Sequence, residues 1–393
     1  MKKSIFIMLA IMLSATSIAQ TKAITLEDIW SNGTFATGAA RVGRSMADGE
    51  RYSLMNNDGI AVYSYKTGEK LADLMLFADI DALKNIMIDS YKIDDNEQQI
   101  LLSANFEPIY RRSGVSDYYL YDIANATLRK LTEDGKQRLT TFSPDGRMVA
   151  YVRNNNLYVM DLATLRERAI TTDGEFNHII NGTTDWVYEE EFSITRGFHF
   201  SPDSRRIAYY RFDESNVKEY SMQMWQDLYP SDYTYKYPKA GEDNSKVEIF
   251  IYDLQQDRRI VPALGSENDQ YLPRFQWTSD PSKLCVMRMN RLQNHMELLL
   301  VNADDNTVQT IYDQTNTGNG KSYVVQEALP LTSKRSLYSI LNGREGCTRF
   351  FDLLLNGGSA NTLLKARMGS YTCADYNCSL FDASISNVLR SRL

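Results

Sequence analysis

The sequence predicts an all-β fold, a β-propeller built from four-stranded antiparallel blades. Three observations predict it. Short strands of alternating hydrophobicity, joined by turn residues, recur about every 40 residues, and helical periodicity is nearly absent. Tyrosine, a residue that favours sheets, occurs 25 times among the 393 residues. The pattern leaves one alternative open, a β-sandwich whose hairpins resemble one another by chance.

The start of the chain has the features of an export signal. Lys2 and Lys3 supply the positive end, residues 5–13 form an apolar run, and the small residues of Ser17-Ile18-Ala19 at its two outer positions suit a signal peptidase. We therefore expect residues 1–19 to be a signal peptide and the protein to be exported, to the periplasm, the cell envelope or the medium. The apolar run is too short to span a bilayer and no cysteine follows it, so we expect no membrane anchor. A buried N-terminal helix is the alternative.

The repeated pattern occupies residues 50–346, after a lead-in at residues 20–49. Its clearest copy is "TFSPDGRMVAYVRNNNLYVMDL" (141–162), in which a Pro-Asp-Gly turn and an Asn-rich turn separate three strands. The stretches "FHFSPDSRRIAYYRFDE" (198–214) and "RFQWTSDPSKLCVMRMNR" (274–291) repeat it. We count five recognisable blades and a less regular sixth after them. The best short helical candidate is "DIDALKNIMI".

Two segments interrupt the repeat. Residues 175–197 contain a run of glutamates between the last strand of one blade and the first strand of the next. Residues 215–246 form a tyrosine-rich insertion, or arm, inside a blade. Long ordered insertions between short strands usually carry function or contact another domain.

The end of the chain departs from the pattern. Residues 347–393 show no clean strand alternation and contain three of the four cysteines. We expect this tail to be atypical, because of a shifted reading frame or a truncated gene. A divergent last blade is the alternative. A disulfide between Cys373 and Cys378 suits an oxidising compartment.

Composition excludes several functions. The net charge of −7 argues against a nucleic-acid partner. The three histidines, His178, His199 and His295, are scattered and none has zinc-site spacing, so we expect no metal site and no cofactor.

The segment "TDWVYEEEF" (184–192) is the strongest candidate for a site. Three consecutive glutamates on a strand would point to alternating faces, but a short helical turn lets two carboxylates flank one point. Thr184 or Asp185 would cap such a turn. Two converging carboxylates form a receptor for an ammonium ion. A solvated acidic run is the alternative, while consecutive residues suit neither a glycosidase nor a calcium loop.

These residues carry a resemblance. "NGTTDWVYEEEF" (181–192), with "YKYPKAGE" (235–242) further on, resembles the dipeptidyl peptidase IV family of serine peptidases. The resemblance covers roughly residues 25–345. It implies an N-terminal eight-bladed propeller, of which this chain would hold five or six blades, followed by an α/β-hydrolase domain.

The resemblance also implies roles for three residues. Glu190 and Glu191 would hold the ammonium group at the start of a peptide substrate, and Arg111 would contact the carbonyl of its second residue. Arg112 is the alternative to Arg111. The family releases dipeptides from N-termini with proline, or less often alanine, in second position. Its members commonly pair through the hydrolase domain and the arm, so a homodimer is expected of full-length members.

The sequence lacks the motif that such chemistry requires. An α/β-hydrolase carries its serine in a G-x-S-x-G turn, and none occurs in the 393 residues. We therefore expect this chain to be a recognition propeller without the Ser-Asp-His domain and inactive alone. The alternative is a stand-alone, non-catalytic propeller that binds peptide N-termini.

Overall fold

The computed structural model describes residues 23–37, 43–225 and 227–315, together with the backbone of three strands beyond them. The chain divides into two compact units, Met1–Arg44 and Ser45–Leu393. In the first unit, the short helix α2 (Leu26–Trp30) begins with a capping box. The Thr25 side chain accepts a hydrogen bond from the Asp28 amide, and the Asp28 side chain accepts one from the Thr25 amide.

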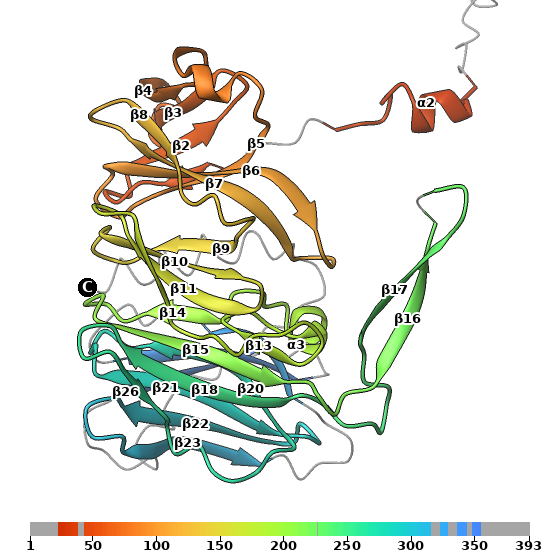
Figure 1. Ribbon diagram of the computed structural model, residues 1–393, viewed down its shortest axis with the longest axis vertical. Helices are drawn as coiled ribbons and strands as arrows, with labels where there is room; N and C mark the ends of the chain where they lie inside the picture. Colours follow the sequence, from red (N-terminus) through yellow and green to blue (C-terminus); the bar gives the residue numbers. More distant parts are fainter. Residues whose placement is uncertain are drawn as a thin grey trace, which may run out of the picture. The chain divides into compact units, whose positions relative to one another are not determined.

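The second unit is a series of antiparallel sheets that follow one another in chain order (Figure 1). The first sheet contains β1 (Arg44–Ser45), β2 (Arg51–Met55), β3 (Gly59–Ser64) and β4 (Lys70–Leu76). The second contains β5 (Ile88–Ile93), β6 (Gln99–Pro108), β7 (Gly114–Asp122) and β8 (Thr127–Lys130). The third contains β9 (Arg138–Phe142), β10 (Met148–Arg153), β11 (Asn156–Asp161) and β12 (Arg166–Ala169).

The fourth sheet contains β13 (Ile179–Asn181), β14 (Phe198–Phe200), β15 (Arg206–Asp213), β18 (Lys246–Asp253) and β19 (Arg258–Ile260). The fifth contains β20 (Gln270–Trp277), β21 (Lys283–Asn290), β22 (His295–Asn302) and β23 (Val308–Thr315). The strands β24 (Tyr323–Ala328), β25 (Ser336–Gly343) and β26 (Thr348–Leu354) pair with one another in that order. The predicted propeller of four-stranded antiparallel blades is confirmed.

Turn chemistry and face-to-face packing explain the repeat. The hairpin between β10 and β11 turns at Asn154 and Asn155, which both have positive φ (47° and 57°), as a tight hairpin turn requires. Val149 and Ala150 point to opposite faces of β10, yet both are fully buried. Val149 packs in a cluster shared with the second sheet, and Ala150 in one shared with the fourth. Each inner strand is therefore apolar on both faces because sheets cover both of its sides.

The arm is a two-stranded hairpin made of β16 (Glu219–Met224) and β17 (Ser231–Lys236). It leaves the fourth sheet after β15 and returns at β18, which pairs directly with β15. The predicted insertion within a blade is therefore present, and Figure 1 shows the hairpin projecting away from its sheet. Trp225, Leu228 and Tyr229, near its tip, are exposed.

Several details differ from the prediction. The expected helix at residues 79–88 is instead two single 3-10 turns, Phe77–Asp79 and Asp81–Leu83, followed by β5. Its apolar residues Ile80, Leu83 and Ile86 recur every third position, which is the period of a 3-10 turn.

Two boundaries also shift. The segment 175–197 is not only an interruption, since it contributes β13 to the fourth sheet. Regular strand structure also continues past residue 346, because β26 pairs with β25 in register from Thr348 to Leu354. The predicted signal peptide at 1–19, the tail beyond 354 and the cysteines at 347, 373 and 378 lie outside the described residues. Within the described residues, no helix has the length and apolarity needed to cross a membrane.

Candidate functional site

The glutamate run lies on a short helix, α3 (Trp186–Glu191), as the sequence predicts. Asp185 is the N-cap, with extended backbone dihedrals, and its Oδ1 accepts a hydrogen bond of 2.9 Å from the Tyr188 amide. Thr184, the other predicted cap, instead donates its hydroxyl to the Ile194 carbonyl. The helix therefore begins where a short acidic side chain can satisfy a free amide.

Buried hydrogen bonds attach α3 to the fourth and fifth sheets. Ser245 Oγ donates to Asp185 Oδ2 at 2.7 Å, and the Leu272 amide donates to the Tyr188 hydroxyl at 2.8 Å. At the other end of the helix, Arg274 Nη2 donates to the Phe192 carbonyl. Burial raises the pKa of Asp185 to about 6, although the hydrogen bonds from Ser245 and from the Tyr188 amide act in the opposite direction. The helix is thus held at both ends.

The first glutamate of the run is structural. Glu189 is 1% exposed, and its Oε1 accepts a hydrogen bond of 2.8 Å from the backbone amide of Arg112, in the loop between β6 and β7. Burial lowers the pKa of the nearby Arg138, and the charge of Glu189 acts against that shift. Glu189 therefore joins α3 to the second blade through a buried carboxylate.

The second and third glutamates face outward. Glu190 Oε1 lies 2.8 Å from Arg111 Nη1, and the side chains are 25% and 70% exposed respectively. Glu191 is exposed and forms no ion pair with any described residue. Of the predicted residues, the structure brings Arg111 and Glu190 into contact and places Glu191 next to them on the helix. The structure also distinguishes the two arginines. Arg111 reaches Glu190 with its side chain, whereas Arg112 contacts the helix through its backbone amide.

Aromatic residues of the arm border this site, and sequence reasoning did not single them out. Tyr110, which precedes Arg111, packs against Tyr233 and Tyr235 with ring centroids 6.4 and 5.6 Å away. Trp186 of α3 packs against Tyr237, just after β17, at 4.2 Å. The high tyrosine content of residues 215–246 was the only signal of these contacts.

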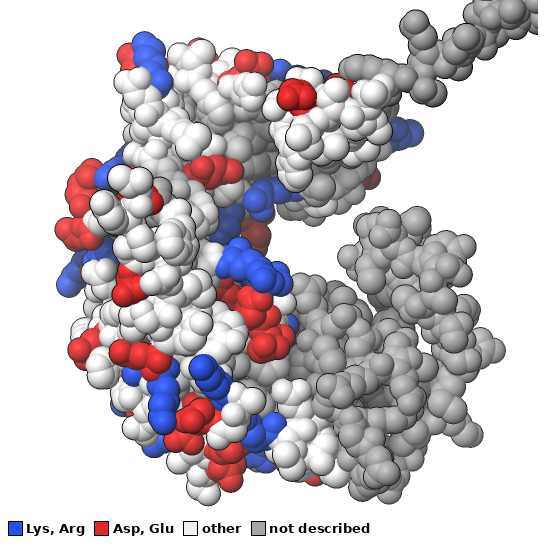
Figure 2. All heavy atoms as spheres, turned by 90° about the vertical axis from the view of Figure 1, so that its right-hand side faces the viewer, with Lys and Arg blue, Asp and Glu red and all other residues white. Residues whose placement is uncertain are grey.

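The charge balance of the site favours a cation. Glu190 is paired with Arg111, whereas Glu191 has no cationic partner among the described residues, so the outward face of α3 presents one carboxylate that no described cation neutralises. An ammonium group supplies one positive charge and three donors, which matches carboxylate oxygens on neighbouring helical residues. On the face drawn in Figure 2, acidic and basic side chains alternate, and neither sign covers a continuous area of the described residues.

A cluster of metal-ligand residue types lies elsewhere, on β22 and β23. It contains His295, Glu297 and Asp313. Arg288 donates to both carboxylate oxygens of Glu297, and His295 Nε2 lies 2.9 Å from Asp313 Oδ1. Arg288 already neutralises Glu297, so contacts between neighbouring strands account for this cluster: an ion pair at Glu297 and a hydrogen bond between His295 and Asp313.

The fold and the site together define a class of protein, a β-propeller with a carboxylate-bearing helix on the segment that enters its fourth blade. The family described as dipeptidyl peptidase IV (DPP IV) N-terminal region matches residues 94–366. The chain belongs to this family.

Individual relatives agree with this assignment. The chain is 30% identical to prolyl endopeptidase FAP from Bos taurus, over 70% of this chain and 36% of the relative. It is 30% identical to dipeptidyl peptidase 4 from Sus scrofa, over 65% of this chain and 36% of the relative. The crystal structure of Porphyromonas gingivalis dipeptidyl peptidase 4 matches with a TM-score of 0.78 and 36% identity, over 84% of this chain and 47% of that one. The chain spans less than half the length of each of these relatives.

Proposed function

We propose that the propeller recognises the charged N-terminus of peptides. Glu190 and Glu191 receive the ammonium group, and Arg111 contacts the carbonyl of the second residue. The observation that carries this proposal is the contact between Arg111 and Glu190, which sets a cation and a carboxylate from separate blades at one place. An N-terminal dipeptide carries the complementary pair, an ammonium group followed by a carbonyl oxygen.

The proposal extends to the role of the propeller in a larger reaction. Two of the relatives are named as dipeptidyl peptidase 4. We propose that this propeller selects substrates for a dipeptide-releasing serine exopeptidase, in which the hydrolytic residues belong to a separate α/β-hydrolase domain. We also propose that the protein is exported to the periplasm or cell envelope. Full-length proteins would pair through the arm.

A binding measurement tests the recognition step. We expect the peptide Ala-Pro-Ala-Ala amide to bind in titration calorimetry, and its N-acetylated form to bind at least about tenfold more weakly, because acetylation removes the ammonium charge. Glu190→Gln and Glu191→Gln should each weaken binding of the free peptide by about tenfold.

Glu69→Gln is the matched control, since it removes one exposed carboxylate from the first blade. It should leave binding unchanged. Equal affinity for the free and acetylated peptides would contradict the proposal.

A further inference from the structure

A cavity of about 480 Å³ lies between the inner strands of several blades, next to the segment that follows α3. Its lining residues come from β5, β9, β14, β20, β21 and β22, and from the loop that joins α3 to β14. It is separate from the outward face of α3, because neither Arg111 nor Glu190 lines it.

Three cationic side chains line this cavity: Lys92, Arg196 and Arg274. None of its described lining residues is aspartate or glutamate. Lys92 Nζ donates to the Thr140 carbonyl at 2.7 Å, and Arg274 donates to the Pro273 and Phe192 carbonyls. These acceptors orient the two cations.

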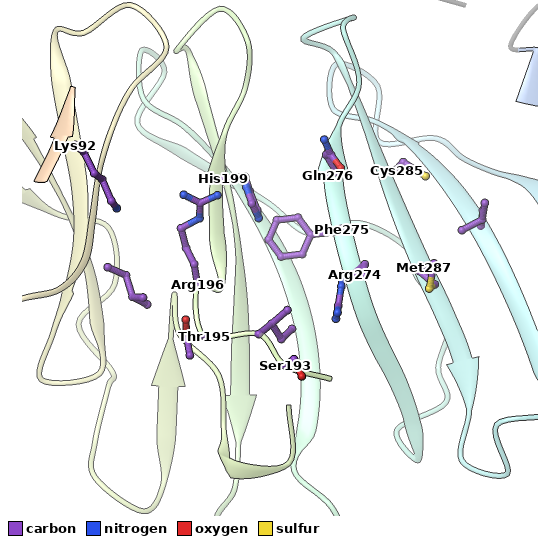
Figure 3. Close-up of a pocket in the computed structure, with 13 residues that line it drawn as sticks. Lys92, Ser193, Thr195, Arg196, His199, Arg274, Phe275, Gln276, Cys285 and Met287 are labelled. Carbon is purple, nitrogen blue, oxygen red and sulfur yellow. The ribbon is translucent and has the colours of Figure 1, made fainter. Parts of the chain in front are cut away.

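Arg196 is the cation most open to a ligand. Its backbone pairs with Thr183, while its guanidinium group forms no hydrogen bond or ion pair with any described residue. The side chain is exposed, yet desolvation lowers the pKa of Arg196. The two observations agree if the group is reached by water only inside a concave, protein-lined space. Figure 3 shows its guanidinium group between Lys92 and the ring of His199.

The remaining walls are mostly apolar or uncharged. Leu139, Ile194, Phe275, Met287 and Leu298 contribute hydrocarbon surface. Burial, helped by the charge of Arg196, lowers the pKa of His199 to about 3, so this ring is neutral near pH 7. Burial also raises the pKa of the Cys285 thiol to about 12. Cations held among apolar walls select an anion that has an apolar body.

We propose that this cavity binds the carboxylate of a small apolar organic acid, in particular the free C-terminus of a short peptide, with Arg196 as its principal partner. A carboxylate accepts two parallel hydrogen bonds from a guanidinium group. Lys92 and Arg274 line the same cavity, and its apolar walls contact the rest of the ligand. This site is independent of the recognition of N-termini proposed above.

The test uses a ligand that the α3 site cannot hold. N-acetyl-Ala-Phe carries a C-terminal carboxylate and no ammonium group, and its C-terminal amide lacks both charges. In titration calorimetry at pH 7 with the full chain, we expect the acid to bind at least about tenfold more tightly than the amide. Arg196→Gln should weaken binding of the acid by about tenfold, and Arg196→Lys by less, because lysine keeps the charge.

Arg147→Gln is the matched control, because it removes one exposed arginine that does not line the cavity. It should leave the affinity for the acid unchanged. Equal binding of acid and amide would overturn the proposal, and that comparison does not depend on the folding of any variant. Inorganic phosphate that binds as tightly as the acid would overturn the apolar ligand class.

Discussion

Three identical residues at 189, 190 and 191 have three different environments. Successive residues of a helix are turned by about 100°, so one carboxylate faces the protein while its neighbours face outward. Glu189 is buried and accepts the Arg112 amide, Glu190 pairs with Arg111, and Glu191 is exposed. Substitutions along the run should therefore have different effects on stability and on binding.

The first prediction concerns Glu189. Glu189→Gln removes the negative charge that offsets the half-buried cation of Arg138, and weakens the bond to the Arg112 amide. We expect the free energy of unfolding to fall by about 1–3 kcal/mol, measured by urea denaturation. Glu191→Gln is the control, and because this side chain is exposed its effect should stay within about 0.5 kcal/mol. Equal effects of the two substitutions would contradict the assignment of a structural role to Glu189.

The root of the arm contains an unusual carboxyl group. Burial raises the pKa of Glu214 to about 8, and the nearby charges of Asp185 and Asp213 act in the same direction, while Lys236 acts against it. Glu214 follows β15, and Asp185 caps α3, so this group lies where the arm and the acidic helix meet.

This pKa predicts how stability depends on pH. Between about pH 4.5 and 8, the folded state keeps a proton on Glu214 that the unfolded state has lost. The contribution of Glu214 to the free energy of unfolding should therefore be highest below that pH range. It should fall by up to a few kcal/mol as the pH rises through the range. Glu214→Gln cannot titrate, so the variant should be more stable than the unaltered chain at pH 8 and should show a flatter profile in thermal unfolding. Parallel pH profiles for the two proteins would contradict this assignment.

The arm should also influence the site through its tyrosines. Tyr233 packs against Tyr110, the residue before Arg111. Tyr233→Ala removes one ring contact, which is worth roughly 0.5–1.5 kcal/mol, so we expect the affinity for a free peptide N-terminus to fall about two- to tenfold. Tyr233→Phe keeps the ring and should lose less. If both variants bind as the unaltered chain does, the arm does not position Arg111.

At the scale of the whole molecule, the repeats could be predicted because every blade depends on local rules. Alternating strands and Asn or Asp-Gly turns mark five blades in the sequence, and all of them are present. The strand β13 was missed because it has only three residues and lies in the segment that interrupts the repeat. Apolar residues at every third position, Ile80, Leu83 and Ile86, imitate the period of a helix over so short a span.

The candidate site was predictable only in part. The helical turn and its cap at Asp185 follow from local preferences. The contact between Arg111 and Glu190 joins residues far apart in the sequence, so no local pattern contains it. The roles of Glu189 and of the arm tyrosines depend on packing between blades and could be seen only in three dimensions.

A final prediction concerns chemistry. The 393 residues contain no G-x-S-x-G motif, so we expect the purified chain not to release p-nitroaniline from Gly-Pro-p-nitroanilide. A dipeptidyl peptidase with its hydrolase domain serves as the positive control. Turnover that a serine-directed inhibitor abolishes would show that the chain carries a nucleophile outside such a motif.

The bond between Glu189 and the Arg112 amide spans 77 positions of the chain, and the bond between Leu272 and Tyr188 spans 84. During biosynthesis, the early blades can therefore collapse as local units long before the acidic helix receives its last anchor. A nascent chain that stops growing shortly after residue 200 would contain every proposed peptide-contacting side chain and still lack the partner of Tyr188. Peptide binding by the nascent chain should consequently appear late in synthesis. It should increase abruptly with chain length and not gradually.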